Sequence, residues 1–174
     1  MSLVAKLLLS PLLIAQAVLT RRRAPMLPEA AGDRRGVFGR GPVLRVLIVG
    51  DSSGAGVGVQ TQDLALAGHL TRTLAEAAQA EVHWHLVAKT GITSAQALEL
   101  VKQERPRPAD VAVVVLGVND VIEQVPSHRA VQHRAALADW LIANSGVGHA
   151  QLLALNWRYA EMWRLQQAGD ESQG

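Results

Sequence analysis

The sequence predicts an α/β fold in which a mostly parallel sheet lies between helices on both faces, and three observations support this fold class. The chain has 174 residues, enough for one domain with a substantial core. About half of the residues (49%) are apolar but aromatic residues are scarce, so the core has to be built from Val, Leu, Ile and Ala, as is usual in a buried parallel sheet. Short apolar runs alternate with segments of helical periodicity, which is typical of βαβ units.

Four segments have the pattern of strands. VLRVLIV is a β-branched and Leu-rich run bounded by glycines, EVHWHLVA alternates apolar and polar residues, and VAVVVL is the strongest buried-strand pattern in the chain. HAQLLAL is a fourth apolar run nearer the C-terminal end. The predicted strands are therefore residues 43–49, 81–88, 111–116 and 149–155.

Helical patterns separate these strands. Apolar residues recur at helical spacing through residues 62–79 and 128–143. Thr93 and Gln96 have the spacing of a capping box, which predicts a helix that begins near Thr93 and ends before the prolines of ERPRPAD. Since such crossovers connect parallel strands, we expect a mostly parallel sheet with its ligand site at the carboxyl ends of the strands.

The N-terminal segment is apolar and then basic. Residues 3–19 are mostly apolar, and three arginines follow at 21–23. A signal peptide, a membrane-associated helix and a helix packed on the domain itself all fit this pattern, and membrane association through residues 3–23 is the favoured interpretation. A cytoplasmic or exported location stays open. Residues 24–42 are rich in Pro, Gly and charge and are predicted to be a linker, so the chain divides into an arm, 1–42, and a domain, 43–174.

Charge and composition exclude several classes of partner. Residues 1–45 have eight basic and two acidic residues, whereas residues 46–174 have nine basic and thirteen acidic residues. The body is therefore mildly acidic, and no nucleic-acid partner is expected. The chain has no cysteine, which excludes thiolate metal sites. His83 and His85 share a strand face, but no third ligand is evident, so no metal is expected.

Polar residues directly follow three of the predicted strands. Asp51 and Ser52 follow the first, Gly91 follows the second and Asn119 follows the third. Because the carboxyl ends of parallel strands meet at one edge, we expect a hydroxyl, a small-residue backbone N–H and a carboxamide to lie near one another. A serine nucleophile needs such neighbours, because preorganised donors stabilise the negative oxygen of its tetrahedral intermediate, typically by ~3 kcal/mol each.

The same residues have simpler interpretations. Ser52 and Ser53 are common at helix N-caps, and Asn119-Asp120 is common in turns. The glycines after Ser53 are spaced Gly-x-Gly-x-Gly, which fits neither a P-loop nor a dinucleotide-binding pattern, so no nucleotide cofactor is expected. The joint occurrence of polar residues at three strand ends favours the nucleophile site.

These motifs resemble the blocks of the SGNH, or GDSL-type, serine hydrolases. GDSSGAGVGV is similar to the first block, AKTGITS to the second and VVLGVND to the third, and the resemblance covers about residues 43–145. It implies that Ser52 is the nucleophile and that the Ser52 N–H, the Gly91 N–H and the Asn119 side chain form an oxyanion hole. It also implies a three-layer, flavodoxin-like sandwich, acyl-ester substrates and no cofactor or metal.

The sequence departs from that family at the base. The family takes its base from a late Asp-x-x-His block, and none of the six histidines follows an aspartate by three residues. The family's last strand and closing helix are not evident either, so we expect a fold truncated at the C-terminus. His128, nine residues beyond Asn119, is the candidate substitute base. The alternatives are a non-catalytic protein of this fold that binds acyl or membrane ligands, and a shortened product of a longer hydrolase. The oligomeric state is not predicted.

Overall fold

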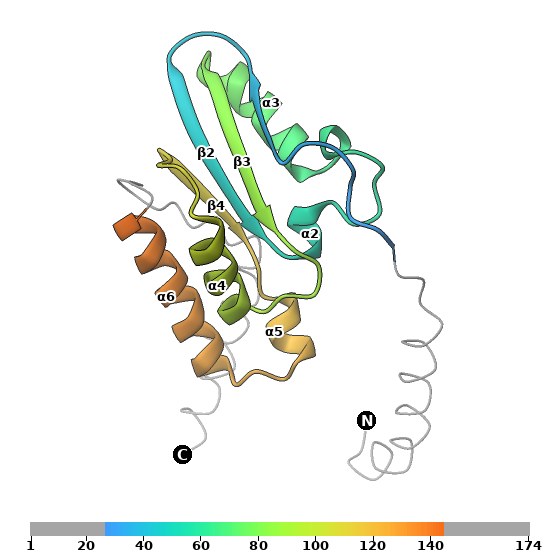
Figure 1. The fold of residues 1–174 in the computed structure, drawn as a ribbon, viewed down its shortest axis with the longest axis vertical. Coiled ribbons are helices and arrows are strands. Elements are labelled where there is room, and N and C mark those ends of the chain that lie inside the picture. The colour runs from blue at the N-terminus through green and yellow to red at the C-terminus, as the bar shows by residue number, and fades with distance from the viewer. Residues whose placement is uncertain (1–26, 145–174) are drawn as a thin grey trace, which may run out of the picture.

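The computed structural model describes residues 27–144, which form a four-stranded sheet between helices on both of its faces (Figure 1). The strand order is β1-β3-β2-β4. The strands are β1 (Arg35–Phe38), β2 (Val43–Gly50), β3 (Glu81–Ala88) and β4 (Val111–Val115). The helices are α2 (Ser52–Ala55), η1 (Gln62–Leu64), α3 (Leu66–Ala78), α4 (Ser94–Glu104), α5 (Val118–Ile122) and α6 (Ser127–Asn144).

Parallel pairing aligns the ends of β2, β3 and β4. β2 pairs in parallel with β3 and with β4, and Gly50 is the register partner of both Ala88 and Val115. The predicted α/β fold class and the three strands predicted at 43–49, 81–88 and 111–116 are therefore confirmed. The fourth predicted strand, at 149–155, and the expected truncation lie outside the described residues.

The core consists of two layers, one on each face of the sheet. Successive residues of β2 point to opposite faces: Leu47 and Val49 pack against α4 and α6, whereas Val46 and Ile48 pack against α2 and α3. All four β2 side chains are almost completely buried, which stabilises the fold by roughly 1.5–3 kcal/mol for each. Aliphatic packing on both faces explains why β2 and β4 have nearly continuous apolar sequences, whereas the first half of β3 alternates apolar and polar residues.

The predicted linker is wrong for residues 35–38. These residues form β1, which pairs antiparallel with β3 and places Arg35 opposite His85. The segment before β1 also contacts the domain, because the Ala30 N–H donates to the carbonyl of Ala55 at 3.1 Å and Ala30 is buried. RGVF has only two apolar residues, so β1 has no sequence pattern strong enough to predict it.

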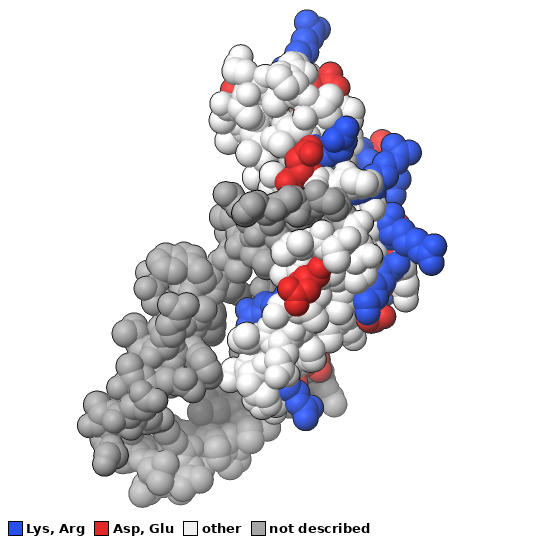
Figure 2. Space-filling view, turned by 90° about the vertical axis from the view of Figure 1, so that its left-hand side faces the viewer, with Lys and Arg blue, Asp and Glu red and all other residues white. Residues whose placement is uncertain are grey.

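The apolar segment at residues 3–19 lies outside the described part of the chain and belongs to the residues drawn in grey in Figure 1 and Figure 2. Among residues 27–144, none of the helices is both long enough and apolar enough to cross a membrane.

Candidate active site

A tight strand-to-helix turn presents Ser52. β2 ends at Gly50, and Ser52 is the first residue of α2, where it is partly exposed. A Cβ at Gly50 would lie 2.9 Å from the Cα of Gly54 and 3.3 Å from the carbonyl oxygen of Val115. Only glycine therefore allows α2 to begin so close to the strand, and the hydroxyl of Ser52 lies beside the carboxyl edge of the sheet.

Asp51 holds this turn in place. Its side chain is 2% exposed and accepts a hydrogen bond from the Ser53 N–H at 2.9 Å, which caps α2. Its own N–H donates to the carbonyl of Val115 at 3.1 Å and so connects the turn to β4. Both contacts are with the backbone, and they orient the residue that follows.

The loop after β3 presents Gly91 to solvent. Gly91 has a φ of +80°, a left-handed conformation that favours glycine, and a Cβ placed there would meet no atom within 4 Å. The loop is joined to the Ser52 turn, because the Lys89 N–H donates to the carbonyl of Gly50 at 3.2 Å. The surface beside Gly91 is therefore open.

A salt bridge from the N-terminal segment supports the same loop. The Glu29 carboxylate accepts from the Thr90 N–H at 2.7 Å and from the Arg34 guanidinium at 2.5 Å. Arg34 also donates to the carbonyl of Ala88, the last residue of β3. Burial by itself would raise the pKa of Glu29, but the hydrogen bonds from Thr90 and Arg34 outweigh it and lower that pKa below its ordinary value of 4.5.

Asn119 belongs to α5, which follows β4. Its amide nitrogen donates to the carbonyl of Ile92 at 3.0 Å, directly beside Gly91 in the chain. A carboxamide has two N–H donors, so this bond leaves the second donor for a ligand. Three side chains of α5 near Asn119 are apolar and about half exposed: Val118, Val121 and Ile122.

Asp120 fastens α5 to α4. Its carboxylate is 2% exposed and accepts from the Ser94 N–H at 2.9 Å and from the Ser94 hydroxyl at 2.5 Å. Ser94 is the first residue of α4. The sequence prediction placed Asp120 in a motif but assigned it no role, and it assigned none to Glu29 or Arg34. The acid after Asn119 was a signal for Asp120, whereas no local pattern identifies the other two.

The structure brings Ser52, Gly91 and Asn119 to one edge of the sheet, at the end where α2 and α5 lie in Figure 1. Each of these residues follows one of the three aligned strand ends. Hydrogen bonds connect the Gly91 loop to both other segments, through Gly50 and through Asn119.

His128 is the predicted site residue that the structure does not join to the others. It is exposed at the second position of α6. Among residues 27–144, no hydrogen bond reaches the Ser52 hydroxyl from His128 or from another histidine. The same residues contain no group of three or more His, Cys, Asp or Glu side chains that could hold a metal ion.

Comparison with known proteins identifies the family. The model of the GDSL-like lipase/acylhydrolase family matches residues 48–171, which is more than half of the chain. The chain therefore belongs to the GDSL-like lipase/acylhydrolase family, as its three motifs predicted. No curated protein matches the chain.

The solved structure of one esterase agrees with this assignment at the level of the fold. The chain is similar to AlinE4, an SGNH-hydrolase family esterase, with 24% identity and a TM-score of 0.53, over 59% of this chain and 55% of AlinE4. It is also similar to the psychrotrophic esterase EstA from Pseudoalteromonas sp., in a form inhibited by monoethylphosphonate, with 24% identity and a TM-score of 0.47, over 58% of this chain and 55% of EstA. The matched regions thus span about half the length of each esterase.

Proposed function

We propose that this protein hydrolyses acyl esters and that Ser52 is its nucleophile. The observation that supports this most directly is that Ser52, Gly91 and Asn119 follow three strands whose carboxyl ends are aligned. In addition, the Asn119 amide donates a hydrogen bond to the carbonyl of Ile92, the residue after Gly91. Membership of the lipase/acylhydrolase family agrees with the same chemistry.

In the proposed reaction, the Ser52 hydroxyl oxygen attacks the ester carbonyl and its proton passes to a base. The carbonyl oxygen becomes negative and accepts hydrogen bonds from the N–H groups of Ser52 and Gly91 and from the second N–H of the Asn119 amide. Collapse of the intermediate breaks the acyl–oxygen bond and releases the alcohol, which takes up the proton. Water then hydrolyses the acyl-serine. The exposed apolar side chains of α5 offer a surface for the acyl chain.

The proposed reaction needs a base that accepts the Ser52 proton. His128 is the candidate, but within residues 27–144 no imidazole is hydrogen-bonded to Ser52. Serine hydrolases that lose one member of the triad keep only a residual rate from the oxyanion hole and from binding. We therefore expect weak turnover of short activated esters such as p-nitrophenyl acetate.

Substitutions in the full chain test this proposal. We expect Ser52→Ala to abolish turnover and Asn119→Ala to lower it by ~100-fold or more, because one oxyanion donor is lost. Ser53→Ala is the matched control. It removes a neighbouring exposed hydroxyl but keeps the backbone N–H at position 53, which donates a hydrogen bond to the Asp51 carboxylate. His128→Ala lowers the rate if this imidazole accepts the proton. Equal rates for the parent and Ser52→Ala would contradict the proposal.

The second candidate is a non-catalytic protein that binds acyl ligands at the same edge. The unpartnered Ser52 hydroxyl among the described residues is the observation that favours it. This candidate predicts no turnover above the Ser52→Ala background, together with saturable binding of a fatty-acyl probe that Asn119→Ala weakens.

A further inference from the structure

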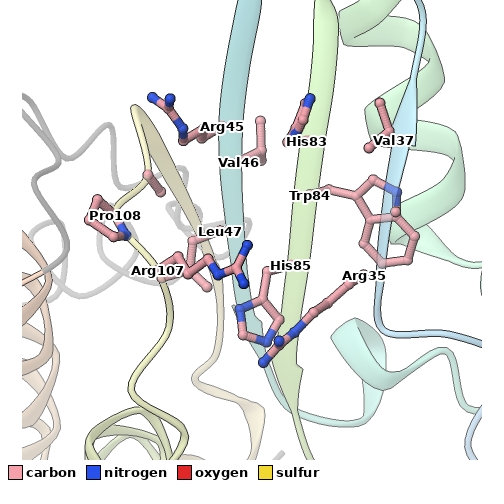
Figure 3. Close-up of a pocket in the computed structure, with 12 residues that line it drawn as sticks. Arg35, Val37, Arg45, Val46, Leu47, His83, Trp84, His85, Arg107 and Pro108 are labelled. Atoms are coloured by element: carbon pink, nitrogen blue, oxygen red, sulfur yellow. The ribbon is translucent and has the colours of Figure 1, made fainter.

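A groove of about 850 Å³ lies on the α4 side of the sheet, beside the middle of β2 and β3 (Figure 3). Arg35 of β1, His85 of β3 and Leu47 of β2 lie side by side in the strand register, and Leu47 packs in the α4 and α6 layer of the core. Residues 107–109, which precede β4, form another part of its lining. The groove is therefore separate from the strand ends that hold Ser52.

The lining of this groove is basic. Three arginines and two histidines line it and none of the lining residues is acidic: Arg35, Arg45, Arg107, His83 and His85. Two of the five have acidic partners, because Arg45 lies 3.7 Å from Asp110 and His83 lies 2.6 Å from Glu81. In the described part of the chain, Arg35, Arg107 and His85 have no ion-pair partner.

These three side chains converge. Figure 3 shows the guanidinium groups of Arg35 and Arg107 turned toward the imidazole of His85. Burial lowers the pKa of His85 below its ordinary value of 6.5, and the positive charges of Arg35 and Arg107 lower it further, whereas Glu104 at the end of α4 raises it. The two arginines are thus close enough to oppose protonation of the ring, and an anion between the three groups would relieve that repulsion.

The donor set indicates the kind of anion. A guanidinium presents two parallel N–H groups that match the oxygen pairs of phosphate or carboxylate, and two guanidiniums with one imidazole offer more donors than one carboxylate can use. A tetrahedral oxyanion accepts from several directions at once. The groove is larger than a phosphate ion, and apolar side chains of Val37, Leu47 and Pro108 also line it, so there is room for an organic group attached to the oxyanion.

We infer that Arg35, His85 and Arg107 form a binding site for the phosphoryl group of a phosphate ester, on a face distinct from the candidate active site. This inference goes beyond the proposed esterase activity and does not depend on it. The phosphoryl group belongs to a soluble phosphate ester or to a lipid headgroup.

Calorimetric titration of the full chain with sulfate and with glycerol phosphate tests the site. Sulfate is the first probe because it does not titrate near neutral pH. We expect the double variant Arg35→Gln/Arg107→Gln to bind both probes at least ~10-fold more weakly than the parent, since each lost contact is a hydrogen bond between charged groups. Arg129→Gln, which removes an exposed arginine of α6 outside the groove, is expected to bind like the parent.

Unchanged binding in the double variant, or no binding by the parent at millimolar sulfate and glycerol phosphate, would overturn the inference. Both arginines are exposed, so the melting temperature without ligand should be the same in parent and variant, and it serves as the check that the variant is folded. Tighter binding of glycerol phosphate than of sulfate is expected if the organic group lies in the groove.

NMR titration of His85 gives a second readout. A bound anion favours the charged imidazole, so saturating sulfate should raise the pKa of His85, and sulfate should bind more weakly as the pH rises from about 5.5 to about 8. His85→Gln should remove this pH dependence. The other charged groups that act on the ring are Arg35, Arg107 and Glu104. A His85 pKa that does not respond to sulfate would contradict the site.

Vesicle sedimentation separates the two sources of the phosphoryl group. If the ligand is a lipid headgroup, the parent should bind phosphatidylglycerol vesicles more strongly than the double variant does. If it is a soluble ester, both chains should bind the vesicles equally while only the parent binds glycerol phosphate.

Discussion

At the residue scale, Gly91 connects backbone conformation with the proposed chemistry. Its φ of +80° disfavours any L side chain, although a Cβ would meet no atom within 4 Å. We expect Gly91→Ala to lower the free energy of unfolding by about 1 kcal/mol, through conformational strain alone. The rate of the proposed esterase reaction should also fall, because a change in the backbone conformation at Gly91 would turn its N–H away from the position proposed for the oxyanion. Urea denaturation and kcat/KM measure the two effects.

Gly58 provides the matched control for this change. It also has a positive φ, +94°, and an added Cβ would meet only Leu27, at 3.8 Å. Gly58→Ala should therefore lose a similar amount of stability and keep its esterase activity. An equal loss of activity in both variants would show that Gly91 acts only through stability.

Glu29 is a positioning residue for the same loop. Glu29→Ala removes the acceptor of the Thr90 N–H and the partner of Arg34, and we expect it to cost about 1–2 kcal/mol and to lower kcat. The control Glu99→Ala breaks only an exposed pair with Lys102 and should change stability by less than ~0.5 kcal/mol.

The effect of Glu29 depends on pH. Its folded-state pKa lies below the ordinary value of 4.5, so its contribution to stability is fully present above that pH and is lost as the pH falls through the folded-state pKa. The difference in unfolding free energy between the parent and Glu29→Ala should therefore shrink below about pH 4.5. A difference that stays constant in acid would exclude a role for the charge.

At the element scale, α4 begins with the capping box that its sequence predicted. The Thr93 side chain accepts from the Gln96 N–H, and the Gln96 side chain accepts from the Thr93 N–H at 2.9 Å. We expect Thr93→Ala to destabilise the protein by about 1 kcal/mol in urea denaturation. Thr73→Ala, at an exposed position within α3, should be neutral or slightly stabilising because alanine is the better helix former.

At the scale of the whole molecule, residues 27–42 contact the domain that the sequence predicted to begin at residue 43. Removing residues 1–42 deletes β1 and its packing through Phe38, together with the salt bridge between Glu29 and Arg34. We expect a chain of residues 43–174 to be less stable than a chain of residues 27–174 by at least ~3 kcal/mol, or roughly 10 °C in Tm. Equal Tm values for the two chains would support the domain boundary that the sequence predicted at residue 43.

The apolar arm remains a prediction of the sequence. We expect the full chain to sediment with anionic vesicles more strongly than a chain that begins at residue 27, because residues 3–23 combine an apolar run with three arginines. The shorter chain keeps all the described elements, so a loss of vesicle binding would be due to the arm. Equal sedimentation of the two chains would reject membrane association through this segment.

Features that depend on a local sequence pattern could be predicted without the structure. β2 and β4 are apolar runs, β3 alternates apolar and polar residues, and α4 has its capping box, so these elements could be predicted. α6 covers the predicted range, but Val131 and Ile142 are about half exposed while Leu137 and Leu141 are buried, so the apolar spacing did not identify its buried face. The parallel arrangement followed from the alternation of strands and helices, since a crossover connects parallel strands. The prediction that Ser52, Gly91 and Asn119 lie at one edge rests on that same reasoning.

The hydrogen bonds and salt bridges that hold the loops at the candidate active site could be found only in the folded structure. Glu29 and Thr90 are 61 residues apart in the chain, Arg34 and Ala88 are 54 apart, and Ser94 and Asp120 are 26 apart. Such contacts depend on which strands become neighbours in the sheet, so no periodic pattern in the sequence indicates them. β1 belongs with them, because a four-residue edge strand is stabilised by its pairing with β3 rather than by its own composition.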